Sequence, residues 1–136
     1  MRRTYLDTSA LRHLLVAHPH TADVAARLMD ADTITATSQI AVTELHRLAL
    51  REPQLTVPDV DAVLDRVDLV ALSTTQLRSA GLLPNLRSGA QLRGLDAIHI
   101  QAALDFNATE FLTSDNKQAD AADLLGLPAR LLTTTR

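Results

Sequence analysis

Thr4-Tyr5-Leu6-Asp7-Thr8-Ser9-Ala10, residues 4–10, reads as a strand that ends abruptly at a carboxylate. Thr4, Tyr5 and Leu6 are residue types that favour the pleated, half-buried backbone of a β-strand. After Asp7 the pattern changes, because leucines at positions 11, 14 and 15 recur at helical spacing and predict a helix that continues to Ala17. The switch places Asp7 at the C-terminal end of a strand.

The composition indicates one domain with an aliphatic core. A chain of 136 residues is long enough for a single core, so we expect residues 1–136 to form one domain. Two phenylalanines, one tyrosine and no tryptophan leave the core to aliphatic side chains and exclude base stacking as a broad mechanism of nucleic-acid recognition. The absence of cysteine excludes disulfides and thiolate zinc sites.

Hydropathy and charge indicate where in the cell the protein acts and how it could bind nucleic acid. The apolar runs are too short to span a bilayer, and Met1-Arg2-Arg3 leads into the first strand without the apolar segment of a signal peptide. We therefore expect a cytoplasmic protein with no membrane association. A net charge of -3 provides no general attraction to nucleic acid. All the basic residues except Lys117 are arginines, which suit bidentate phosphate contacts but can equally reflect genome composition.

Strand-like and helix-like segments alternate along the whole chain. The expected strands cover residues 4–6, 33–36, 69–72, 110–113 and 129–132. The expected helices cover residues 10–17, 21–29 with Thr21 as the cap, 40 to about 53, 56–67, 74–83, 95–106 and 116–125, and residues 84–94 form an irregular loop. Strands separated by helices imply parallel pairing with right-handed crossovers. The pattern predicts an α/β fold, a three-layer sandwich with a central, mainly parallel, five-stranded sheet.

Four acidic residues are expected at one edge of this sheet. Strand C-termini and helix N-termini share the edge at which such folds bind ligands. Asp7 and Asp115 follow strands, Asp96 begins a helix, and Glu44 lies in the second turn of another helix beside its apolar stripe. Crowded carboxylates repel one another and require protons or a cation, and oxygen ligands favour Mg²⁺ or Mn²⁺ over zinc. The pattern therefore predicts a metal site.

Each acid also has an ordinary structural interpretation. Asp7 and Asp115 could simply cap the helices that follow them. Asp96 could be a first-turn residue that the helix dipole stabilises, and Glu44 could be a solvated helix residue. The metal-site hypothesis depends on the four acids together.

The chain resembles a known family, the PIN-domain ribonucleases, and in particular the VapC-like toxins of bacterial toxin–antitoxin pairs. The resemblance covers the whole chain in order, through the segments YLDTSAL at 5–11, VTEL at 42–45, LRGLDAIH at 92–99 and FLTSD at 111–115. It implies that Asp7, Glu44, Asp96 and Asp115 form the acidic, metal-binding catalytic site.

The resemblance further implies an activity and partners. The activity would be metal-dependent endoribonuclease cleavage of RNA phosphodiester bonds, with Mg²⁺ or Mn²⁺ as cofactor, by the toxin of a toxin–antitoxin pair. The partners would be a small cognate antitoxin that covers the acidic pocket and a second copy of the chain in a homodimer. The leucines at 11, 14 and 15 could form the dimer surface, although core packing explains them equally.

Polar and basic residues near the same edge are candidates for substrate contacts. The candidates are Ser9, Arg12, Arg93 and Lys117, with Arg87 in the loop as a further basic residue. Ser9, like Thr8 or Thr113, could orient a ligand or hold a phosphate, although capping explains Ser9 as well. His99 lies one helical turn after Asp96 and could point toward the site, but its apolar neighbours favour a packed imidazole with one hydrogen bond.

Two rival enzyme and signalling classes fit the sequence less well, and one alternative remains open. A haloacid-dehalogenase-like phosphatase needs a second aspartate two residues after the first, where Ser9 stands. A receiver-type signalling domain usually has paired acids before its first helix and a lysine after its last strand, and neither is found. The remaining alternative is a catalytically silent PIN domain that acts as a protein- or RNA-binding module.

Overall fold

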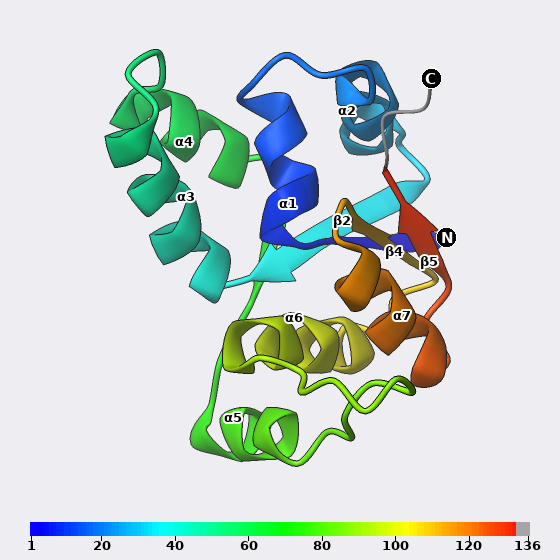
Figure 1. The fold of residues 1–136 in the computed structure, drawn as a ribbon. Helices are drawn as coiled ribbons and strands as arrows, with labels where there is room; N and C mark the ends of the chain where they lie inside the picture. Colours follow the sequence, from blue (N-terminus) through cyan, green and yellow to red (C-terminus); the bar gives the residue numbers. More distant parts are fainter. Residues whose placement is uncertain (133–136) are drawn as a thin grey trace.

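Five parallel strands form the centre of the computed structural model, which describes residues 1–132. The strands are β1 (Arg2–Leu6), β2 (Thr33–Ser38), β3 (Asp68–Val70), β4 (Glu110–Thr113) and β5 (Ala129–Leu131). The helices are α1 (Thr8–Leu11), α2 (Thr21–Met29), α3 (Ile40–Arg51), α4 (Val57–Leu64), α5 (Thr74–Gly81), α6 (Gly94–Asp105) and α7 (Asn116–Leu124), with a 3₁₀ turn at Arg12–Leu14. The strand order is β3-β2-β1-β4-β5, and every neighbouring pair is parallel, which confirms the predicted sheet (Figure 1).

The central strand β1 fixes which chain segments meet at the C-terminal edge. Tyr5 pairs with Ala36 of β2 on one side and with Phe111 of β4 on the other. The next pair along β1 and β4 is Leu6 with Leu112, so Asp7 and Thr113 leave the two strands side by side.

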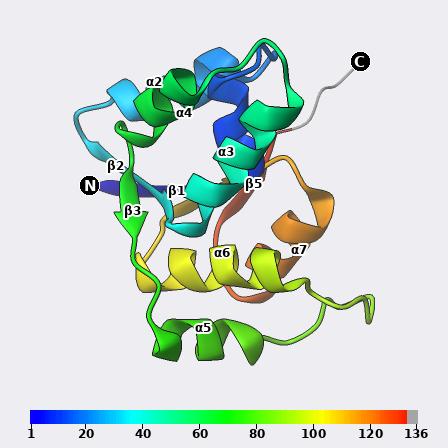
Figure 2. The same cartoon turned by 90° about the vertical axis from the view of Figure 1, so that its left-hand side faces the viewer.

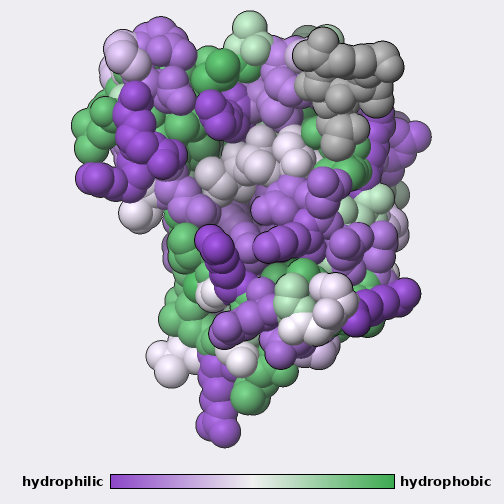
Figure 3. All heavy atoms as spheres, viewed as in Figure 1, coloured by the Kyte–Doolittle hydropathy of each residue, from purple (hydrophilic) through white to green (hydrophobic). Residues whose placement is uncertain are grey.

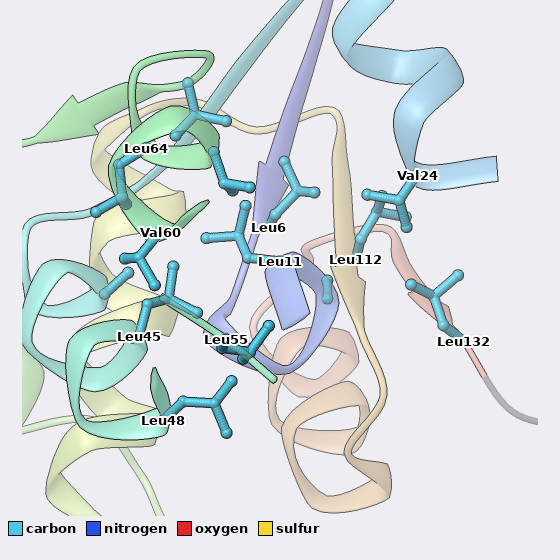
Figure 4. Close-up of a cluster of buried hydrophobic side chains, with 14 residues drawn as sticks. Leu6, Leu11, Val24, Leu45, Leu48, Leu55, Val60, Leu64, Leu112 and Leu132 are labelled. Carbon is cyan, nitrogen blue, oxygen red and sulfur yellow. The ribbon is translucent and has the colours of Figure 1, made fainter. Parts of the chain in front are cut away.

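Helices cover both faces of the sheet, each over its own buried cluster (Figures 1 and 2). One cluster is almost wholly leucine and valine and joins β1 and β4 to α1, α2, α3 and α4, with Leu6, Leu11 and Leu45 among its residues (Figure 4). The other contains Tyr5 and Phe111 and joins the sheet to α6 and α7. The largely aliphatic core expected from the composition is confirmed.

The first helix differs from its prediction. A regular α-helix covers only Thr8–Leu11 and is followed directly by the 3₁₀ turn. The spacing of the leucines does not distinguish the two, because over a single turn it suits an α-helix and a 3₁₀-helix alike. The expected Thr21 cap is wrong, because His20 occupies the N-cap position and the Thr21 hydroxyl donates to the His13 carbonyl at 2.6 Å. Leu11 is fully buried in the core, whereas Leu14 and Leu15 pack against the same cluster and remain partly exposed.

The remaining elements begin and end within a few residues of their predicted bounds. The Thr56 hydroxyl caps α4 by accepting from the Asp59 backbone N–H, and the Thr56 backbone N–H donates in turn to the Asp59 carboxylate. Over residues 1–132, none of the helices combines the length and the apolar character that crossing a membrane requires.

Candidate active site

The four predicted acids stand on four different elements at the C-terminal edge of the sheet. Asp7 follows β1, Asp115 follows β4, Asp96 lies in the first turn of α6, and Glu44 lies on α3. Burial raises the pKa of Asp96, and the negative charges of Asp115, Asp7 and Glu44 raise it further. The other three acids are therefore close enough to Asp96 to repel its charge. Hydrophilic side chains cover the middle of the face seen in Figure 3.

Asp7 is the most buried of these acids and the most firmly held. Its Oδ1 accepts hydrogen bonds from the Ser9 hydroxyl at 2.6 Å and the Ala10 backbone N–H at 3.0 Å, and its Oδ2 accepts one from the Thr113 hydroxyl at 2.5 Å. Burial raises the pKa of Asp7, although these donors and nearby His99 oppose the shift. Asp7 does cap α1, and three bonds leave lone-pair capacity on its two oxygens for a further ligand.

Asp115 and Asp96 are held by the start of α7. Asp115 caps this helix and accepts from the backbone N–H groups of Lys117 at 2.8 Å and Gln118 at 3.4 Å. The buried Gln118 donates through Nε2 to the Asp96 carbonyl at 3.1 Å, which joins the first turns of α6 and α7. Sequence reasoning missed Gln118, and its only signal was an amide among the alanines of an otherwise apolar helix face.

Glu44 is held by a buried histidine. Its Oε1 lies 2.6 Å from the Thr8 hydroxyl, which donates to it, and 2.8 Å from Nε2 of His99. Nδ1 of His99 lies 2.7 Å from the Tyr5 hydroxyl, so the expectation of a single hydrogen bond for this imidazole is wrong. Burial alone would raise the pKa of Glu44, but the hydrogen bonds from His99 and Thr8 lower it.

The donor chemistry of this edge fits a hard divalent cation, because the acids supply only oxygen ligands and a shared negative charge. Among residues 1–132, no three histidine, aspartate or glutamate side chains are arranged so that they could hold a metal ion together in their present orientations. Glu44 is turned toward Thr8 and His99, and Asp115 toward the backbone of α7. A cation held by several of these acids would therefore require their carboxylates to rotate, and in Glu44 the oxygen that contacts neither Thr8 nor His99 is Oε2.

Basic side chains flank the acids on two sides. One groove contains Asp96 and Asp115 together with Ser9, Arg93 and Lys117. A second groove contains Ser9 and Glu44 together with Arg12, His13 and Arg51. Arg51 was not predicted, and Arg12 also pairs with Glu52 at 3.2 Å. Arg87 lies exposed in the loop before α6 and lines neither groove.

A protein family and a curated ribonuclease match this sequence. Residues 4–124 match the PIN domain family. Ribonuclease VapC47 of Mycobacterium tuberculosis is 33% identical over 119 residues, which cover 83% of this chain and 85% of that protein.

Solved structures with the same fold include three from VapC or VapBC systems. The structure of VapBC2 from Rickettsia felis, bound to a DNA fragment from its promoter, superposes with a TM-score of 0.71 at 18% identity, covering 96% of this chain and 99% of the other. VapBC-1 from nontypeable Haemophilus influenzae gives 0.69 at 17% identity, covering 95% and 97%. VapC20 of M. tuberculosis, a sarcin–ricin loop cleaving toxin, gives 0.67 at 13% identity, covering 91% and 95%. The fold, together with the match over residues 4–124, shows that the chain belongs to the PIN domain family.

Proposed function

We propose that this protein is a metal-dependent endoribonuclease that hydrolyses RNA phosphodiester bonds as the cytoplasmic toxin of a toxin–antitoxin pair. The observation that carries the proposal is the meeting of four acids at one sheet edge, where three of them repel the charge of Asp96 and buried Asp7 is held by three donors. Membership of the PIN family and the 33% identity to a VapC ribonuclease support the same function.

Different side chains of the acidic edge would bind the metal, orient its ligands and contact the RNA. Asp7, Glu44, Asp96 and Asp115 would hold Mg²⁺ or Mn²⁺. When bound, such an ion polarises a phosphoryl oxygen and lowers the pKa of a water. Ser9 and Thr113 orient the Asp7 carboxylate, and Arg93 and Lys117 stand where they can contact RNA phosphates.

The partners follow from the charge of the site and from the relatives. Repulsion among the acids favours an antitoxin that places an arginine or lysine among them. The VapBC relatives are toxin–antitoxin complexes, and one was solved on promoter DNA. We propose an equivalent antitoxin for this chain, a homodimer, and residues 1–136 as a single PIN domain.

Cleavage of RNA by an Asp7→Asn variant tests the proposal. The amide has nearly the shape of the carboxylate and can keep the bonds from Ser9 and Ala10, so the fold is retained while the charge is lost. We expect cleavage in Mg²⁺ or Mn²⁺ to disappear, whereas Asp65→Asn, an exposed acid at the C-terminal end of α4, cuts like the unchanged protein. Full activity of a pure Asp7→Asn preparation would refute the assignment.

If the chain is instead a catalytically silent binding module, the unchanged protein should not cut RNA. It would leave transfer, ribosomal and messenger RNA intact in either metal while it bound RNA or a partner protein tightly. Mapping the ends of any cleaved RNA would also identify the target.

A further inference from the structure

His99 lies between two polar residues from different parts of the chain. Its ring is 3% exposed and is held on α6, while Tyr5 comes from the central strand and Glu44 from α3. Both ring nitrogens of His99 lie within hydrogen-bond distance of a side chain. Nδ1 lies 2.7 Å from the Tyr5 hydroxyl, and Nε2 lies 2.8 Å from Oε1 of Glu44. The ring thus connects the sheet interior to one of the four acids.

The partners determine which nitrogen carries the proton. An ionised carboxylate only accepts hydrogen bonds, so the nitrogen facing Glu44 must be the donor. The Thr8 hydroxyl donates its single proton to Oε1 of Glu44. It also lies 3.1 Å from Nε2 of His99, so toward this nitrogen its oxygen can only accept. In a neutral imidazole Nδ1 is then the acceptor, and the Tyr5 hydroxyl donates to it. A phenol is protonated at neutral pH, so Tyr5 has a proton to donate.

We infer that His99 is a positioning residue, which Tyr5 orients through Nδ1 so that its Nε2–H fixes the direction of the Glu44 carboxylate at the acidic edge. The inference rests on the proposed metal-dependent function of that edge. Within residues 1–132, the donors to Glu44 both contact Oε1, so Oε2 is the oxygen that can turn toward a cation. A histidine that only filled space in the core would not need hydrogen bonds to Tyr5 and Glu44.

The protonation pattern of His99 in the metal-free protein is the first test. In ¹⁵N NMR of the histidine rings, we expect Nε2 of His99 to carry a proton, because this nitrogen faces the Glu44 carboxylate. A proton on Nδ1 alone would overturn the inference, because Glu44 would then face no donor. This result depends on neither metal binding nor RNA cleavage, so it is separate from the proposed function.

The affinity for Mn²⁺, measured by calorimetry, is the second test. Removing a partner that orients a metal ligand typically weakens metal binding by about 10–100-fold, which we expect for His99→Leu and, toward the lower end, for Tyr5→Phe. His99→Gln should retain most of the affinity, because its amide can still donate to Glu44. Thr4→Val is the matched control, since it removes a buried hydroxyl from the same strand that donates to Glu110 instead.

Folding of each variant is checked by circular dichroism before the titration. Folded Tyr5→Phe and His99→Leu proteins that bind Mn²⁺ like the unchanged protein would overturn the positioning role. If the unchanged protein bound no Mn²⁺ or Mg²⁺, the metal-dependent function and the role of His99 in it would both fail, and the NMR result would still show whether Tyr5 and Glu44 orient the ring.

Discussion

The Thr113 hydroxyl donates a 2.5 Å hydrogen bond to Asp7 and so joins the ends of two neighbouring strands at the acidic edge. The strand register explains the contact, because Leu6 pairs with Leu112 and the chain on each side then continues with Asp7 and Thr113. The same hydroxyl oxygen accepts from the Asp115 backbone N–H at 3.1 Å. One side chain therefore connects two of the four acids.

Replacing Thr113 by valine should weaken the fold and disturb Asp7 together. Both partners are buried, and a lost hydrogen bond to a charged group costs about 1.5–3 kcal/mol of unfolding free energy. Because this donor lowers the pKa of Asp7, the pKa of that carboxyl should rise further. Denaturant unfolding and ¹³C NMR of the carboxyl groups measure the two effects. Thr113→Ser keeps the hydroxyl and should restore the pKa of Asp7. Equal changes of the unfolding free energy and of this pKa in Thr113→Val and Thr113→Ser would contradict the role of the hydroxyl.

The buried carboxyl of Asp7 should make the metal-free protein less stable as the pH rises. Since its pKa is raised in the folded state, the folded protein holds this proton more tightly than the unfolded chain, whose aspartates titrate near 3.9. The unfolding free energy should then fall as the pH rises from about 4 through the folded pKa. Asp7→Asn should remove this part of the fall and leave the part due to Asp96, whose pKa is also raised. Parallel stability curves of the two proteins would show that Asp7 does not titrate in this way.

Metal addition provides an independent check on the same residue. A ligand that binds only the folded state raises its stability, so Mn²⁺ should increase the melting temperature of the unchanged protein at neutral pH. Asp7→Asn should show a much smaller increase, because it has lost the central carboxylate. Asp65→Asn should respond like the unchanged protein, and an undiminished response of Asp7→Asn would move the metal site elsewhere.

The grouping of the acids could be predicted from the sequence, whereas their individual partners could not. Alternating strand and helix patterns imply parallel strands, and parallel strands by themselves bring Asp7 and Asp115 to one edge. The contacts that orient the site join residues far apart in the chain, such as Glu44 with His99, 55 positions apart, and His13 with Ser114, 101 positions apart. These depend on the rotation of each helix about its axis and on strand register, which local patterns do not specify.

The basic residues of the groove should contact RNA phosphates without base specificity. Each phosphate contact to a single strand contributes about 0.7 to the slope of log affinity against log salt. If Arg93 and Lys117 each make one contact, replacing both by methionine should weaken RNA binding at low salt and reduce the slope by about 1.4. Binding is measured in EDTA, so that no RNA is cut. Arg66→Met, which changes an exposed arginine between α4 and β3, is the matched control, and an unchanged slope in the double variant would exclude these two residues.

His13 should contribute stability that is lost at mildly acidic pH. Burial lowers its pKa to about 4, and the neighbouring His18, His20 and Arg12 charges contribute to the shift. Its ring lies with its centroid 3.8 Å from that of His18, and its Nε2 is 2.6 Å from the Ser114 hydroxyl at the end of β4. Because the unfolded chain takes up this proton near pH 6.5 and the folded protein only near 4, the unfolding free energy should fall as the pH drops through this interval.

The opposite pH dependence of Asp7 overlaps this interval, so the effect of His13 is best measured in the Asp7→Asn protein. Comparing Asp7→Asn with the double variant Asp7→Asn/His13→Gln isolates the histidine, since glutamine can still bond Ser114 but does not titrate. We expect the single variant to lose on the order of 1–3 kcal/mol more than the double variant between pH 6.5 and 4. Identical losses in the two proteins would mean that His13 is protonated as readily in the folded protein as in the unfolded chain. A smaller loss in the single variant would mean that the folded protein favours the charged ring.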